Sequence, residues 1–184
     1  GSGTSYASGA SYTPSAATTL YAQWTANTYT IKFNDNGATG GSTANQTITY
    51  DVATALTANG FTRAYKVTFN ANSGTCSTSS LTATYSFNGW KSSVATGTYG
   101  STSAACTTAV TTSAVINNKY YVKNLAASGS VTFTAQWTSA SVTLPTPTRT
   151  GYTFNGWYTA ATDGTMVGGA GESYTPSAAT TLYA

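Results

Sequence analysis

The stretch SYTPSAATTLYAQW, residues 11–24, returns in its first twelve letters as residues 173–184. It contains neither a histidine nor a carboxylate, so a packing requirement explains the copy better than a reaction does. Internal similarity of this kind is typical of repeat architectures. We therefore interpret the dodecapeptide as a marker of the same structural position in successive units.

A strand that opens into an Asn/Gly turn is also written twice. It reads YTIKFNDNGATGG at residues 29–41 and YKVTFNANSGT at residues 65–75. In both copies apolar residues occupy alternate positions, which is the period of a half-buried strand. The turn residues that follow end each strand.

A third repeated element is YSFNGW at residues 85–90, which returns as YTFNGW at residues 152–157. Asn-Gly readily adopts positive φ, so we interpret it as a bulge or tight turn that directs Trp90 and Trp157 inward.

The closing strand completes the set, as TTLYAQW (18–24), VTFTAQW (131–137) and TTLYA (180–184). Its alternate residues share one face, as in the other elements. The four tryptophans could form a sugar-binding platform, but residues required in each unit favour a core role. The predicted module core is Trp24, Trp90, Trp137, Trp157, Phe87, Phe154, Leu20 and Phe133.

The composition favours a folded β-protein over a disordered one. Only 6% of the 184 residues are charged, whereas 13% are aromatic and 40% hydrophobic. Branched and aromatic side chains suit a pleated surface and supply the apolar area that disordered segments lack. The net charge of +3 comes from scattered cations, which make a poor phosphate track, so no nucleic acid partner is expected. The sequence contains no run of about twenty apolar residues, so membrane insertion of this segment is not expected.

At this point a family resemblance becomes visible. The segments TYDVATALTANGFTR, RTGYTFNGWYTAATDGT, VKNLAASGSVTFTAQW and SYTPSAATTLYAQW resemble the Listeria–Bacteroides repeat, also described as the internalin B-repeat. The resemblance implies a mainly β fold of tandem, small, β-grasp-like repeat modules with little helix. It implies an extracellular or bacterial cell-surface protein, and it supplies no catalytic residues.

The phase of the repeats predicts four consecutive segments. Residues 1–24 are the tail of a repeat module, and 25–64 are the opening half of another. Residues 65–137 are a complete variant module, and 138–184 lack the opening hairpin and the final QW. An unfinished unit leaves a bare sheet edge. Either the chain is part of a longer array, or neighbouring modules or subunits complete it by strand addition.

The residues offer little catalytic or metal chemistry. There is no histidine, and the acids are Asp35, Asp51, Asp163 and Glu172. Asp35 lies in NDNG, but the further oxygen-ligand spacing of an EF-hand loop is missing, which favours a plain turn. Glu172 would be the acid to examine for an intramolecular Lys–Asn bond, although no spacing indicates a partner. We expect a non-enzymatic protein without a metal or cofactor.

Cys76 and Cys106 lie thirty residues apart, with no histidine or second cysteine pair beside them, so zinc is not expected. In an oxidising compartment we favour a disulfide between them over two buried free thiols.

Three functions compete. The first is a structural stalk or fibre segment of an adhesin, and the second is a binding module for host glycans or proteins. The third is a filament subunit joined to identical subunits by strand complementation. The expected partners are accordingly neighbouring modules, identical subunits, or a host glycan or protein. Aromatic residues outside the shared motifs discriminate between the stalk and the binding module. If they gather in a groove, binding is favoured, and if they scatter, a stalk is favoured. These residues are Tyr6, Tyr99, Tyr120, Tyr121 and Tyr158.

Overall fold

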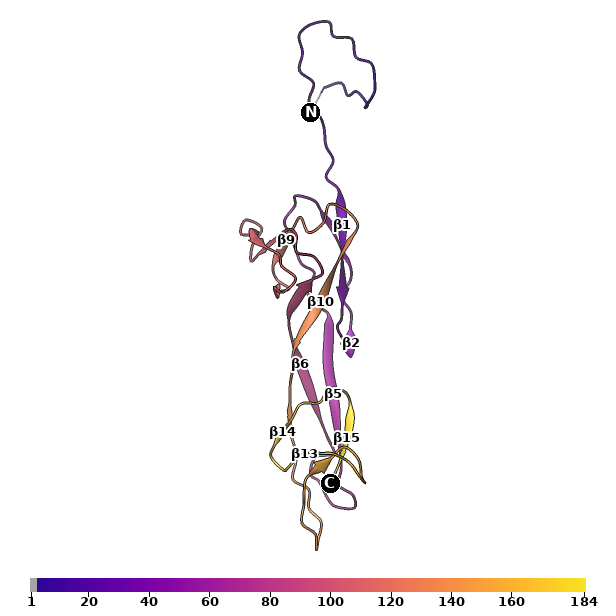
Figure 1. The fold of residues 1–184 in the computed structure, drawn as a ribbon, viewed down its shortest axis with the longest axis vertical. Coiled ribbons are helices and arrows are strands. Elements are labelled where there is room, and N and C mark those ends of the chain that lie inside the picture. Colours follow the sequence, from indigo (N-terminus) through magenta and orange to yellow (C-terminus); the bar gives the residue numbers. More distant parts are fainter. Residues whose placement is uncertain (1–2) are drawn as a thin grey trace.

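The computed structural model describes residues 3–184 as an elongated molecule with its two termini at opposite ends (Figure 1). All of its helix and strand elements are strands, which confirms the mainly β fold. They are β1 (Thr28–Asn34), β2 (Gly40–Gly41), β3 (Gln46–Thr49), β4 (Thr54–Ala55), β5 (Phe61–Asn70), β6 (Ser80–Ser92), β7 (Thr98–Gly100), β8 (Thr108–Ala109), β9 (Tyr121–Lys123), β10 (Ser130–Thr138), β11 (Val142–Thr143), β12 (Trp157–Tyr158), β13 (Met166–Gly168), β14 (Ser173–Tyr174) and β15 (Thr180–Tyr183).

The main sheet runs in the order β13-β12-β15-β5-β6-β10-β1-β3, with β2 paired to β5. Two of its pairings are parallel, β1 with β10 and β15 with β5. These two parallel pairs are equivalent, because in each an opening strand lies beside a closing strand. Phe33 is opposite Phe133 in the first pair, and Phe69 is opposite Leu182 in the second. The repeated sequence elements therefore occupy repeated positions.

The long strand β6 joins the two pairs. Its residues 80–85 pair with β5, and its residues 86–92 pair with β10. Along the chain the order is thus first opening strand, second opening strand, first closing strand and second closing strand. The two units are interlocked in sequence.

This pairing differs from the four consecutive segments expected from the sequence. Residues 65–137 do not form a self-contained sheet, because most of their opening strand, β5, pairs with β15, while their closing strand, β10, pairs with β1. Repeat phase alone does not show this, because each opening strand fits any closing strand of its type.

Two hydrophobic clusters match the two units. The first cluster is Tyr29, Ile31, Ile48, Leu56, Trp90, Val110, Ile116, Val122, Leu125, Val131, Phe133 and Ala135. The second cluster is Val67, Phe69, Ala83, Val142, Leu144, Trp157 and Leu182.

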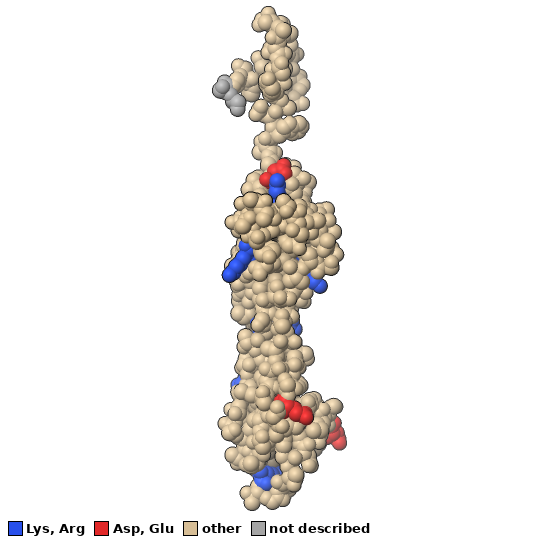
Figure 2. Space-filling view, turned by 90° about the vertical axis from the view of Figure 1, so that its left-hand side faces the viewer, with Lys and Arg blue, Asp and Glu red and all other residues tan. Residues whose placement is uncertain are grey.

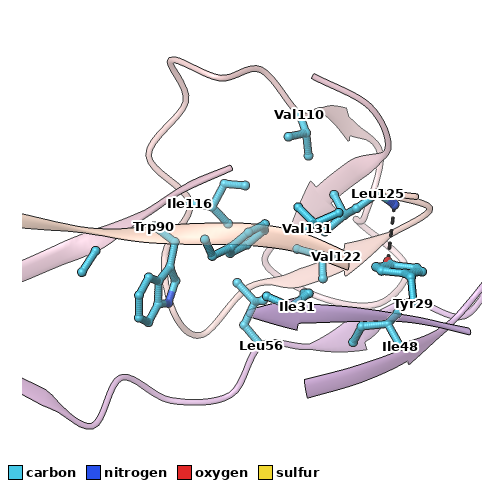
Figure 3. Packing of buried hydrophobic residues seen from close by; sticks show 12 residues of the cluster. Tyr29, Ile31, Ile48, Leu56, Trp90, Val110, Ile116, Val122, Leu125 and Val131 are labelled. Atoms are coloured by element: carbon cyan, nitrogen blue, oxygen red, sulfur yellow. Dashed lines mark hydrogen bonds between the residues drawn. The ribbon is translucent and has the colours of Figure 1, made fainter. Parts of the chain in front are cut away.

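The first cluster is the larger because a second sheet, β4-β9-β7-β8, covers it. Figure 3 shows Val122 and Leu125 packed beside Tyr29. The Tyr29 hydroxyl accepts a hydrogen bond from the backbone N–H of Leu125 at 3.4 Å. Burial raises the pKa of this hydroxyl. Tyr29 is therefore a core residue with a satisfied polar end.

The first Asn-Gly element, Asn88-Gly89, forms the expected irregularity within a strand, whereas Asn155-Gly156 lies just before β12 and outside any strand. Gln136 of β10 lies opposite Gly89 of β6, and the next residue, Trp137, lies opposite Phe87. Asn88 is therefore the extra residue of a bulge, and Gly89 has φ of 132°. The interpretation of Asn-Gly as a bulge is confirmed here, and the strand beyond it places Trp90 in the first cluster.

Gly89→Ala should destabilise the protein by about 2–3 kcal/mol, through backbone strain and overpacking. A Cβ there would lie 2.7 Å from the carbonyl oxygen of Ile116. Gly151→Ala is the matched control, because φ is 81° but nothing lies within 4 Å. Its cost should be about 1 kcal/mol, from strain alone. Urea unfolding measures both, and equal costs would show that the close approach has no effect.

Candidate functional site

The sequence favours a core role for the tryptophans over a sugar-binding platform. Trp90 and Trp157 are fully buried in the first and second clusters, respectively. Phe133 is fully buried as well, and Phe87, Trp137 and Phe154 pack against the clusters from their edges. These aromatic rings fill the interior and its margins, so they do not form a flat, exposed surface for a sugar ring.

Two predicted core residues lie elsewhere. Trp24 is 91% exposed and Leu20 is 60% exposed. The expectation that they are core residues is therefore wrong for this structure. They belong to residues 3–27, which contain no strand and extend beyond the end of the sheet (Figure 1). A closing strand buries its apolar face only when an opening strand lies beside it.

The indole N–H groups show which rings are anchored. Trp157 donates to the carbonyl oxygen of Pro145 at 2.8 Å, and Trp137 donates to that of Asp35 at 3.0 Å. The Trp90 N–H is buried without a hydrogen-bond partner among the described residues. Trp90 is held by the packing of Phe33 and Phe87, with ring centroids at 4.7 and 4.8 Å.

Two of the acids accept hydrogen bonds within local turns, whereas Asp51 contacts residues that are distant in the sequence. Gly37 N–H donates to the Asp35 carboxylate at 3.2 Å, and Gly169 N–H donates to that of Glu172 at 2.8 Å. Asp51 lies 3.7 Å from the Lys123 ammonium. Residues 3–184 contain no group of three or more His, Cys, Asp or Glu that could hold a metal ion. On the face in Figure 2, charged side chains are few and, apart from one adjacent acid–base pair at the upper end of the body, widely spaced.

The cysteines do not form the expected disulfide. Both are free: Cys76 packs against the second cluster, and Cys106 is buried near the second sheet. The Cys106 thiol donates to the carbonyl oxygens of Thr98 and Tyr121 at 3.4 and 3.6 Å. Spacing along the chain could not reveal that the two residues belong to different units.

We expect both thiols to be alkylated in unfolded, unreduced protein, adding two labels by mass. In the folded protein the half-buried Cys76 should react faster than Cys106, because reaction requires an accessible thiolate. A Cys76→Ser variant identifies the slower residue. If the protein takes up label only after reduction, the two cysteines form a disulfide and the free-thiol assignment is wrong.

The discriminating tyrosines lie in three places. Tyr99 and Tyr120 stack at 6.2 Å by the second sheet, where Tyr121 also lies in β9. Tyr6 contacts Tyr12 in the N-terminal segment, whereas Tyr158 is in β12 near the other end. They do not gather in one groove.

One open cleft lies at the C-terminal end of the molecule. It has a volume of about 1070 Å³ and is lined by residues 71–75, residues from the segment 147–164, and Ala184. Phe154 and Tyr158 supply apolar surface. The Arg149 guanidinium lies 3.9 Å from the Tyr152 ring centroid and donates to the carbonyl oxygen of Asn72 at 3.2 Å. The cleft is thus lined mainly by small and polar residues, with a few aromatic rings, one engaged cation and the acid Asp163.

The interlocked sheets, buried motif tryptophans and low charge define a β-rich repeat protein. Comparison with known families agrees: residues 120–184 match the family described as the Listeria-Bacteroides repeat domain. The family resemblance is confirmed for these residues. No curated protein and no solved structure matched the chain significantly. Within residues 3–184, no helix is long and apolar enough to cross a membrane.

Proposed function

We propose that this chain is a non-enzymatic structural segment, a stalk or spacer, in a cell-surface or extracellular bacterial protein. The observation that carries the proposal is the interlocking of two repeat units along one axis. The termini lie at opposite ends, and the long strands β5, β6 and β10 run along the molecule (Figure 1). A spacer needs this arrangement, because it must hold its two ends apart.

The strand pairing suits a load applied through the ends. β15 ends next to the C-terminus and lies parallel to β5, with residues 180–183 in register. Ladder hydrogen bonds run across the strands, so a pull along the axis loads them together. β6 then connects β5 to β10, which lies beside β1. Tension therefore passes through one continuous sheet.

The surface also fits exposure to changing surroundings. Attraction between exposed charges is weakened by salt, and a single surface ion pair contributes about 0–1 kcal/mol. Within residues 3–184 the only salt bridge is Lys123–Asp51, and both side chains are partly or largely exposed. Stability that rests on apolar packing and backbone pairing changes little with ionic strength.

Single-molecule pulling through the two ends tests the proposal. We expect one extension step for both units at high force, because they share β6. The matched control pulls the same chain through residues 74 and 184, which lie at the same end, beside the cleft. That geometry peels β15 from β5 pair by pair and should need less force. Equal forces, or extension at very low load, would contradict the load-bearing role.

The scatter of the discriminating tyrosines favours this role over a binding module. A host glycan or protein would need a shared apolar surface, and these five residues occupy three separate regions. Saturable glycan binding that survives substitution within the cleft would instead favour the binding module.

A further inference from the structure

The two units meet at a stretch of only two paired strands. β5 pairs with β2 at residues 61–62 and with β15 from Val67 onward, and β6 pairs with β10 only from Ser86 onward. Among the strands, residues 63–66 and 82–85 therefore pair only with each other. We call this stretch the joint; there β5 and β6 run side by side through the middle of the molecule (Figure 1). A two-stranded ribbon twists more than a wider sheet, so the ladder alone holds the joint weakly.

Each unit holds the turn after its opening strand with an arginine. In the first unit the Arg63 guanidinium donates to the carbonyl oxygen of Asn36 at 3.3 Å, and in the second Arg149 donates to that of Asn72 at 3.2 Å. The carbonyl oxygen just before each arginine accepts from the backbone N–H three residues after the asparagine, at 2.8 and 2.7 Å. The two arginines are therefore equivalent in the repeat.

The aromatic neighbours of the two arginines differ. The guanidinium carbon of Arg149 lies 3.9 Å from the ring centroid of Tyr152, in its own unit. That of Arg63 lies 5.5 and 5.0 Å from the ring centroids of Tyr65 and Tyr85, which both belong to the joint. The Arg63 Nε–H also donates to the Tyr65 hydroxyl at 3.0 Å. Arg63 thus contacts the turn of the first unit and the joint at once.

These contacts continue into both units. Asn36 donates its side-chain N–H to the carbonyl oxygen of Ala135 in β10 at 2.8 Å. On the other side, the Tyr85 hydroxyl donates to the carbonyl oxygen of Pro176 at 2.6 Å, in the connection between β14 and β15. A continuous series of contacts therefore runs from the closing strand of the first unit through Arg63 to the second unit.

We propose that Arg63 is a positioning residue that fixes the angle between the two units. A planar guanidinium can lie against aromatic rings and donate from its edge at the same time, whereas a lysine ammonium cannot do both. The stiffness of the molecule along its axis depends on Arg63 and not on its equivalent, Arg149. This inference goes beyond the spacer role, because it concerns bending in the absence of load.

Double electron–electron resonance between two spin labels measures this bending as the width of a distance distribution. The labels are attached to Thr49→Cys in β3 and Ser173→Cys in β14, two exposed positions in the first and second units. The chain also carries Cys76→Ser and Cys106→Ser, so that only the two introduced thiols react. The measurement uses the full chain without load, so its result is independent of the pulling experiment.

We expect a narrow distribution for the chain with Arg63 and a roughly twofold broader one for Arg63→Lys, which keeps the charge but loses the planar fork. Arg149→Lys is the matched control. It removes the equivalent hydrogen bond to a turn, away from the joint, and should leave the width unchanged.

Tyr85→Phe is a second, milder variant. It keeps the ring beside Arg63 and removes only the hydroxyl that donates to Pro176, so it should also broaden the distribution. An unchanged width for Arg63→Lys or for Tyr85→Phe would overturn the proposal. Equal broadening by Arg149→Lys would overturn it as well, because the width would then depend on the turns and not on the joint. A cooperative urea transition for each variant ensures that folded proteins are compared.

Discussion

A fragment of residues 65–137 should be unfolded, although its sequence contains an opening strand, a GW element and a closing strand. In the full chain β5 lies beside β15, and β10 lies beside β1. The fragment contains neither outer partner, so both of its parallel pairings are lost. It also lacks Tyr29, Ile31 and Ile48 of the first cluster. Two bare edges and two incomplete cores leave too little burial to offset the entropy of ordering the chain.

The longer fragment 3–137 separates the two units and is the matched control. It keeps all members of the first cluster and removes Val142, Leu144, Trp157 and Leu182 from the second. Hydrogen exchange should show protection retained in β1 and β10 and lost in β5 up to the middle of β6. Circular dichroism should show a cooperative transition for this fragment only. A cooperative transition for residues 65–137 would contradict the interlocked arrangement.

The local structure was readable from the sequence because it depends on near neighbours. Period-two alternation identified the opening and closing strands, and Asn-Gly identified the bulge at Asn88. The burial of Trp90 and Trp157 follows from the same alternation. The interpretation did not hold for each copy, because residues 18–24 form no strand and Asn155-Gly156 lies outside one.

The partnership between strands was not readable in the same way. β1 and β5 have equivalent sequences, so nothing in either one selects between β10 and β15. The choice depends on the position of the β5–β6 hairpin in the chain, where β5 is inserted ahead of the GW element of β6. That position is a long-range property of the sequence. The same limit explains Leu20 and Trp24, whose burial depends on a partner strand, and the cysteines, which lie in different units.

The C-terminal cleft could not be predicted from the sequence. Its lining comes from residues 71–75 and from the segment 147–164, and only the folded chain brings these distant segments together.

Replacing either buried tryptophan by alanine should lower the free energy of unfolding by about 3–5 kcal/mol. Trp90 packs between Phe33 and Phe87, and Trp157 packs 5.0 Å from the ring of Phe69. Because β6 and β5 connect the units, each substitution should destabilise the whole sheet. Chemical denaturation followed by circular dichroism measures the loss. A cost below about 1 kcal/mol at either position would contradict its role as the centre of a cluster.

Phenylalanine at the same positions separates packing from hydrogen bonding. Trp157→Phe removes the 2.8 Å hydrogen bond to Pro145 and leaves that carbonyl without the indole donor. Trp90→Phe removes a buried N–H that has no partner among residues 3–184, and so relieves an unsatisfied donor. A lost neutral hydrogen bond costs about 1 kcal/mol, and an unsatisfied buried group costs about 1–3 kcal/mol. Trp157→Phe should therefore cost at least about 1 kcal/mol more than Trp90→Phe, although both lose similar ring volume. Equal costs would show that the indole N–H groups contribute equally in the two units, and that their different partners have no effect on stability.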